Sequence, residues 1–219
     1  MLIPYQVDTL FQRNPWTNIA LLLLNCICFV LLICGVFPED LIPYMVLKEW
    51  SIPELIGYQF MHADILHLLF NMIYLWVFGN AICAVMSGFV YPWVYLLLGA
   101  IAGIVHMFVS GSPVVGASGA ISGIIGLYLA IYPLNKISCF YLFLFKGGTF
   151  EISGCLLLLF WFGVDLFSAS GHGGHIAYWA HLGGTVAGFV AGIIFLQLGL
   201  IYRTNIDHPT VIELFSHGS

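Results

Sequence analysis

Hydrophobic residues in this chain gather into long runs that short polar segments separate. Six of these runs approach the roughly 20 residues that an α-helix needs to cross the hydrocarbon core of a bilayer. They cover residues 17–37, 57–80, 89–109, 117–134, 150–169 and 177–200. The pattern predicts an all-α fold, a polytopic bundle of six transmembrane helices, with residues 1–219 forming a single membrane-embedded domain.

Composition indicates that a membrane, and not water, surrounds most of the chain. Hydrophobic residues make up 61 % of the sequence and charged residues only 7 %, whereas a soluble domain carries about a quarter charged residues. The formal net charge is −5 and the sequence contains no tract of basic residues. Both features argue against a nucleic-acid partner. We therefore expect an integral, multi-pass membrane protein whose surroundings are lipid.

The basic residues predict the orientation of the bundle. With the N-terminus in the cytoplasm, Lys48 alone falls in an outer loop, and the other four basic residues face the cytoplasm, as the positive-inside rule requires. Those four are Arg13, Lys136, Lys146 and Arg203. The sequence shows no extra span or targeting segment, which favours a bacterial inner membrane over a mitochondrial one.

Polar residues within the runs converge on one depth. The second run, "HADILHLLFNM", places His67 and Asn71 four residues apart and so on one helical face. Ser118 stands at the start of the fourth run and His181 near the start of the sixth. In the predicted orientation all four lie in the outer half of the bilayer. Polar groups inside a span cost free energy and are functional by default.

Glycines follow both Ser118 and His181 at helical spacing. They are Gly119, Gly123 and Gly126 in the fourth run and Gly184, Gly188 and Gly192 in the sixth. Such small-residue stripes let two helix backbones approach closely. If the two runs pack through them, Ser118 and His181 meet near the top of the contact. The imidazole of His181 can then activate the Ser118 hydroxyl as a nucleophile, and His67 and Asn71 can donate hydrogen bonds to an oxyanion.

Each of these features also has a purely structural interpretation. A serine between glycines often serves only helix packing, and Asn71 can act as polar glue between helices. A different function, a metal or haem protein, draws on the eight histidines, but neither H-E-x-x-H nor a cysteine–histidine cluster occurs. The combination of four polar residues at one depth favours catalysis, without a cofactor or metal.

Three motifs in this order, "HADILHLLFNM", "GASGAISG" and "AHLGGTVAG", resemble those of the rhomboid intramembrane serine proteases. The resemblance covers roughly residues 15–202. It implies a Ser118–His181 dyad, with Ser118 as nucleophile and His181 as general base, and an oxyanion-stabilising pair of His67 and Asn71. It also implies transmembrane protein substrates, cleaved near the outer membrane face after they enter sideways from the lipid.

The sequence departs from the family's pattern at two places. Trp50 has no arginine beside it in the first outer loop, and Ser122 stands where many members carry an aromatic residue four positions after the nucleophile. Some relatives of the family lack the serine or the histidine and only bind membrane proteins. That inactive binder is the alternative, although both residues are present here.

Other residues near the motifs have weaker predicted roles. We expect a structural role for His62, and Asp64 is a candidate to orient His67. Bulky fifth-run residues such as Trp161 and Phe162 are candidates to close a lateral gate, together with the glycine-rich outer loop "SGHGGHIAYW".

Overall fold

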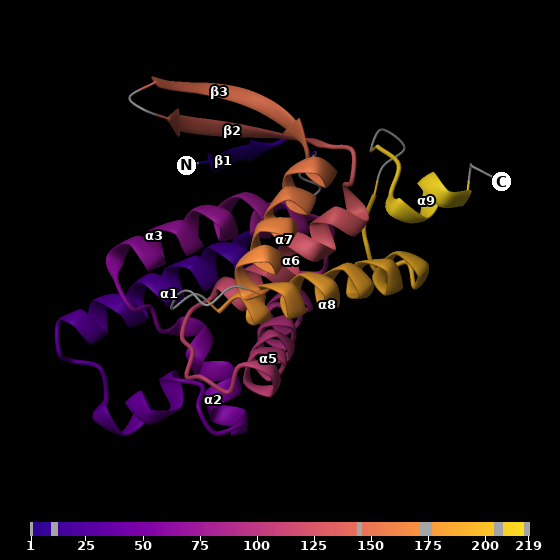
Figure 1. Cartoon of the computed structure of the whole chain (residues 1–219). Coiled ribbons are helices and arrows are strands. Elements are labelled where there is room, and N and C mark those ends of the chain that lie inside the picture. Colours follow the sequence, from indigo (N-terminus) through magenta and orange to yellow (C-terminus); the bar gives the residue numbers. More distant parts are fainter. Residues whose placement is uncertain (1, 10–12, 144–145, 171–176, 204–207, 217–219) are drawn as a thin grey trace.

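The computed structural model describes residues 2–9, 13–143, 146–170, 177–203 and 208–216. Over this part the chain is mostly helical (Figure 1). Its helices are α1 (Trp16–Ile33), α2 (Ile52–Gly57), α3 (Ile65–Tyr74), α4 (Asn80–Val85), α5 (Tyr91–Val109), α6 (Ser118–Ile131), α7 (Gly154–Ser170), α8 (Tyr178–Gln197) and α9 (Val211–Ser216). Short 3-10 segments at Glu39–Met45 and Tyr58–Phe60 and a π-helical segment at Leu75–Gly79 complete the helical elements.

Four helices are long and apolar enough to cross a membrane, counting only the described part of the chain. They are α1, the continuous helix Ile65–Val85 that contains α3 and α4, α5 and α8. The protein is therefore an integral, multi-pass membrane protein, and four of the six predicted spans are confirmed by length and composition. Helix α6 has 14 residues and rises about 21 Å, less than the roughly 30 Å of hydrocarbon. Helix α7 is also short, so six crossings stay a prediction.

The chain also forms a three-stranded antiparallel sheet, so the all-α prediction is confirmed for the mostly helical architecture and is corrected by these strands. Strands β1 (Leu2–Val7), β2 (Lys136–Phe143) and β3 (Lys146–Ser153) lie in the order β1-β2-β3. Figure 1 shows this sheet along one side of the helices. Four residues of the predicted fifth span, 150–153, belong to β3, and α7 begins only at Gly154. Aromatic and β-branched residues, which fit a pleated surface better than a helix, are frequent in β2.

Helix α6 is the centre of the bundle. All but three of its 14 residues are buried, and it packs most extensively against α8 and then against α5 among the helices. A helix that is apolar on all sides, as α6 is, packs in the interior of a bundle with other helices around it.

The packing of α6 on α8 is a backbone contact. A Cβ atom added at Gly188 would fall on the carbonyl oxygen of Gly123, and one added at Gly126 would fall on the carbonyl oxygen of Thr185. Gly184 approaches the carbonyl of Gly119 in the same way. This confirms the predicted contact between the fourth and sixth runs through their glycines.

A polar network fixes the π-helical turn between α3 and α4. Asn18 Nδ2 donates to the Leu75 carbonyl at 2.9 Å and to Asn80 Oδ1 at 2.8 Å, while the Tyr91 hydroxyl donates to Asn18 Oδ1 at 2.7 Å. Asn18 is fully buried. The network ties α1 and α5 to the second span and supplies a partner for a carbonyl at the π turn.

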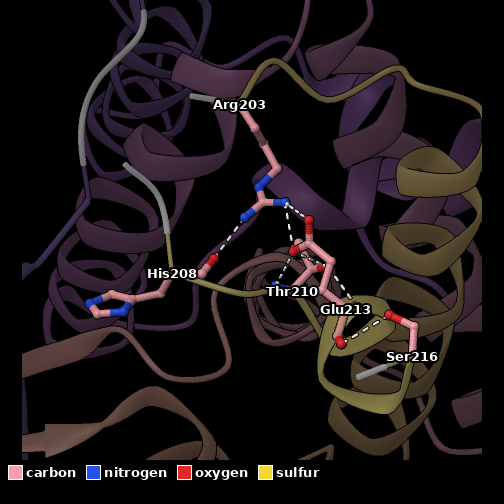
Figure 2. Close-up of polar contacts among 5 residues, drawn as sticks. All are labelled: Arg203, His208, Thr210, Glu213 and Ser216. Carbon is pink, nitrogen blue, oxygen red and sulfur yellow. Dashed lines mark hydrogen bonds and ion pairs between the residues drawn. The ribbon is translucent and has the colours of Figure 1, made fainter. Parts of the chain in front are cut away.

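The C-terminal segment folds back through a separate polar cluster (Figure 2). Thr210 and Glu213 form a reciprocal capping box at the start of α9, because each side chain accepts a hydrogen bond from the other residue's backbone N–H. Arg203 donates to both carboxylate oxygens of Glu213, at 3.0 and 2.9 Å, and to the His208 carbonyl. The hydrogen bond from the Thr210 backbone, together with Arg203, holds the pKa of Glu213 below its ordinary value.

Candidate active site

Ser118 is the first residue of α6, and a glycine turn leads into it. Gly116 has a φ of +122°, a conformation that L side chains rarely adopt. Its backbone N–H donates to the Tyr58 carbonyl at 2.8 Å, which pins the turn to the segment before α3. Ser118 itself is half-buried.

His67 and Asn71 face this turn from α3. A Cβ atom added at Gly116 would lie 2.7 Å from both Cε1 and Nε2 of His67 and 3.8 Å from Nδ2 of Asn71. The two side chains therefore share one helical face, as predicted, and that face meets the backbone two residues before Ser118.

Both side chains present hydrogen-bond donors here. The backbone N–H of Ala63 donates to His67 Nδ1 over a long 3.4 Å. A neutral ring that accepts at Nδ1 carries its proton on Nε2, the atom that lies against Gly116. Asn71 Nδ2 is buried and has no hydrogen-bond partner within the described part of the chain. A buried donor without a partner is costly and is available to a group that enters the site.

His181 lies in the first turn of α8, at the level of Ser118. Its neighbour Ala180 has its Cβ 3.7 Å from the Cβ position of Gly119, the residue after Ser118. The His181 ring is edge-on to that of Tyr178, with 6.5 Å between centroids, and interacts electrostatically with His67. The starts of α3, α6 and α8 thus meet at one end of the bundle, each with its predicted polar residue.

Two weaker predictions have different outcomes. Asp64 Oδ1 accepts the backbone N–H of His67 at 2.8 Å and so caps α3; that Asp64 also orients the His67 ring stays a prediction. His62 is buried, and its ring packs edge-on against that of His67, with 5.1 Å between centroids.

Trp161 of α7 contacts the second span. Its ring lies 5.0 Å, centroid to centroid, from that of Tyr74 on α3. Most of the outer loop "SGHGGHIAYW", residues 171–176, is outside the described residues.

One residue near the site, His106, was not predicted from the sequence motifs. His106 of α5 is only 4 % exposed, and it interacts electrostatically with His181. The available signal was its position as an isolated polar residue in the otherwise apolar run "AIAGIVHMFV".

The histidines that the structure describes do not combine into a metal-ligand set. Within the described ranges, no group of three or more His, Cys, Asp or Glu side chains has the geometry to hold a metal ion. The chemistry that this arrangement supports is that of a serine, a histidine and two hydrogen-bond donors.

A family model for the rhomboid domain matches residues 49–198. The chain belongs to the rhomboid family. Among curated proteins it is similar to Rhomboid protein 1, mitochondrial, of Saccharomyces cerevisiae, with 29 % identity over 206 residues, 84 % of this chain and 55 % of that protein. It is 33 % identical to Rhomboid protease GluP of Bacillus subtilis over 132 residues, 60 % of this chain and 24 % of that protein. Rhomboid protease GlpG of Haemophilus influenzae is 27 % identical over 143 residues, 64 % of this chain and 67 % of that protein.

The rhomboid match contains all four residues that the sequence motifs predicted for the site. The chain spans little more than half of the yeast relative and about a quarter of the Bacillus one. Because the relatives include both mitochondrial and bacterial proteins, the predicted bacterial inner membrane stays a prediction.

Proposed function

We propose that this rhomboid is an intramembrane serine endopeptidase in which Ser118 is the nucleophile and His181 the general base. The observation that carries the proposal is the backbone-to-backbone packing of α6 on α8, which brings the first turns of the two helices together. A serine hydroxyl needs such a neighbouring base to react at neutral pH.

In the proposed reaction, His181 takes the proton of the Ser118 hydroxyl as its oxygen attacks the carbonyl carbon of the scissile peptide. The carbonyl π bond opens and its oxygen becomes an oxyanion. When the C–N bond breaks, the leaving amine takes the proton from His181, and an acyl-Ser118 ester remains. A water then gives a proton to His181 as its oxygen attacks the ester carbonyl carbon. The ester C–O bond breaks, the carboxylic acid product leaves, and His181 returns the proton to the Ser118 oxygen.

The proposed oxyanion donors are His67 Nε2–H, Asn71 Nδ2–H and the backbone N–H of Ser118. The first two face the Gly116 turn, and the third is one of the N–H groups left unpaired at the start of a helix. Donors fixed in advance stabilise the charged intermediate more than the neutral substrate, because they need not reorganise as charge develops.

The proposed substrates are transmembrane proteins, cleaved near the outer face of the membrane, with the N-terminus of this chain in the cytoplasm. A substrate helix must then enter from the lipid between two helices. The contact of Trp161 with Tyr74 closes α7 against α3, so we assign the entrance to this pair of helices.

Reaction with a fluorophosphonate probe tests the proposal in detergent-solubilised protein. We expect covalent labelling at Ser118, found by mass spectrometry of the modified peptide, and cleavage of a model transmembrane substrate. Ser118→Ala and His181→Ala should lose both reactions while the melting temperature stays near that of the wild type. Full cleavage by Ser118→Ala would refute the serine mechanism.

Two alternatives give different results in the same experiment. An inactive rhomboid that only binds membrane proteins would retain the substrate without cleaving it, and its Ser118 would not be labelled. A metal-dependent enzyme would lose activity with a chelator and recover it with zinc, whereas the serine mechanism predicts no response to the chelator.

A further inference from the structure

His106 lies on the face of α5 that packs against the starts of α6 and α8. One turn earlier on this helix, the Ala102 Cβ is 2.8 Å from the Cβ position of Gly119 and 3.4 Å from that of Gly184. Residues four apart share a helical face. His106 therefore continues this contact toward the end of the bundle that holds Ser118 and His181.

The neighbouring residue confirms how closely α5 approaches α8. The Cβ position of Gly183 lies 2.7 Å from the Cβ of Val105. Gly183 is two residues beyond His181, and Val105 directly precedes His106. The electrostatic interaction between His106 and His181 agrees with this placement.

Hydrogen bonding fixes which nitrogen of His106 is a donor. Nε2 lies 3.0 Å from the Ser112 carbonyl oxygen, an atom that can only accept, and 3.3 Å from the Ser112 hydroxyl oxygen, which can accept as well because the hydroxyl has Ser110 Oγ at 2.7 Å as a partner for its own proton. Nε2 therefore carries the proton of the neutral ring, and Nδ1 has a free lone pair. Nδ1 is buried and has no hydrogen-bond partner in the part of the chain that the structure describes. The ring thus presents a buried acceptor without a donor.

The proposed general base, His181, needs a hydrogen-bond acceptor of this kind when it is protonated. A histidine that takes the Ser118 proton at one ring nitrogen becomes an imidazolium, and its other nitrogen is then a charged N–H donor. In a low-dielectric site such a donor needs an acceptor.

We propose that His106 is a positioning residue for His181 and acts through one bridging water, which accepts the His181 ring N–H and donates to His106 Nδ1. His106 then keeps its own proton on Nε2, bonded to Ser112, and takes none during the reaction. It holds the orientation of His181 and stabilises the imidazolium. This inference rests on the proposed function, because it assigns His106 to the same reaction.

Two amide substitutions separate this role from a structural one. His106→Asn places an amide oxygen near the position of Nδ1 and loses the bond to Ser112. His106→Gln reaches Ser112 from the position of Nε2 and offers nothing near Nδ1. His106→Leu removes both and sets the baseline. The kcat and KM for a model transmembrane substrate are measured for each, with kcat normalised to the fraction that a fluorophosphonate labels and with melting temperature recorded.

The proposal predicts that Gln and Leu lower kcat on the order of 10- to 100-fold with KM unchanged, the loss of one hydrogen bond to a charged group. Asn should keep kcat well above both. A Gln variant as active as Asn, or an Asn variant as slow as Leu, would overturn the proposal, since His106 would then only anchor the segment at Ser112. If the wild type neither cleaves nor is labelled at Ser118, the proposed function fails and this inference with it.

Discussion

A single methyl group at Gly188 should separate the two helices that carry the proposed dyad of Ser118 and His181. The added Cβ would lie 2.6 Å from the carbonyl carbon of Gly123 and 2.9 Å from its Cα, on top of the carbonyl oxygen. Carbon atoms pack at about 3.5–4.0 Å, and backbone atoms in mid-helix cannot rotate away. In Gly188→Ala we therefore expect α8 to withdraw from α6 by on the order of 1 Å.

In Gly188→Ala we expect a large fall in the rate of the reaction at Ser118 and only a small fall in the free energy of unfolding. Overpacking costs about 1–3 kcal/mol, and the better helix propensity of alanine offsets about 1 kcal/mol of this. A misplacement of about 1 Å between reacting groups can slow a reaction roughly 100-fold. Ser118 stands on α6 and His181 stands two turns from Gly188 on α8, so the rate of fluorophosphonate labelling should fall by about that factor.

Gly163→Ala on α7 is the matched control, because its added Cβ meets no atom within 4 Å. It makes the same chemical change in another apolar helix. Its labelling rate should stay within about twofold of wild type, and its melting temperature should not fall. If Gly188→Ala is labelled and melts like the wild type, the glycine contact does not set the geometry of the dyad and our reasoning is wrong.

Three further predictions concern the oxyanion site, the entrance and the C-terminal cluster. Asn71→Ala should lower kcat on the order of 10- to 1,000-fold with little change in KM; wild-type kcat, or a loss explained by a lower melting temperature, would make Asn71 structural. Trp161→Val should speed cleavage of a transmembrane substrate and leave labelling by a small probe unchanged; equal or slower cleavage by a folded variant would contradict a gate at Tyr74. Because the folded state lowers the pKa of Glu213, its contribution is complete above the ordinary glutamate pKa and is lost as the pH falls through the lowered value. The protection factors of the α9 amides, which correct exchange rates for their intrinsic pH dependence, should accordingly fall in acid in the wild type and be less pH-dependent in Glu213→Gln; the same acid response in both would exclude Glu213 as its cause.

The helical part of the fold could be predicted from the sequence because an apolar run of spanning length indicates a helix that crosses the bilayer, whether its side chains face lipid or protein. Four of the runs are helices of spanning length. The sheet could not be predicted in this way. Its strand β2 is flanked by β1 and β3, with Leu2 opposite Tyr141, a pairing between residues far apart in sequence. Periodicity reports only local structure, and the apolar character of β2 matches a buried helix segment as well as a strand.

The proposed site residues could be named from the sequence because several independent signals agreed on them, and their roles stay predictions. Ser118 and His181 each precede a glycine stripe, and His67 and Asn71 share a face. His106 had no such support, since an isolated histidine in an apolar run is equally typical of polar glue between helices. Its proposed role depends on which ring nitrogen of His106 donates to the Ser112 carbonyl, and only the folded structure shows this.

Two separate constraints favour glycine at position 116, two residues before Ser118. Gly116 needs a positive φ, which the sequence "GASG" makes plausible, and its Cβ position is also occupied by the ring of His67, which no sequence pattern reveals. An alanine at this position would meet both obstacles. On the other side of Ser118, Gly119 and Gly184 bring α6 against α8. Ser118 is thus held between the Gly116 turn, which lies against the ring of His67, and the glycine contact of α6 with α8. Small residues, and not polar ones, therefore set how closely the proposed oxyanion donors and the proposed base approach Ser118.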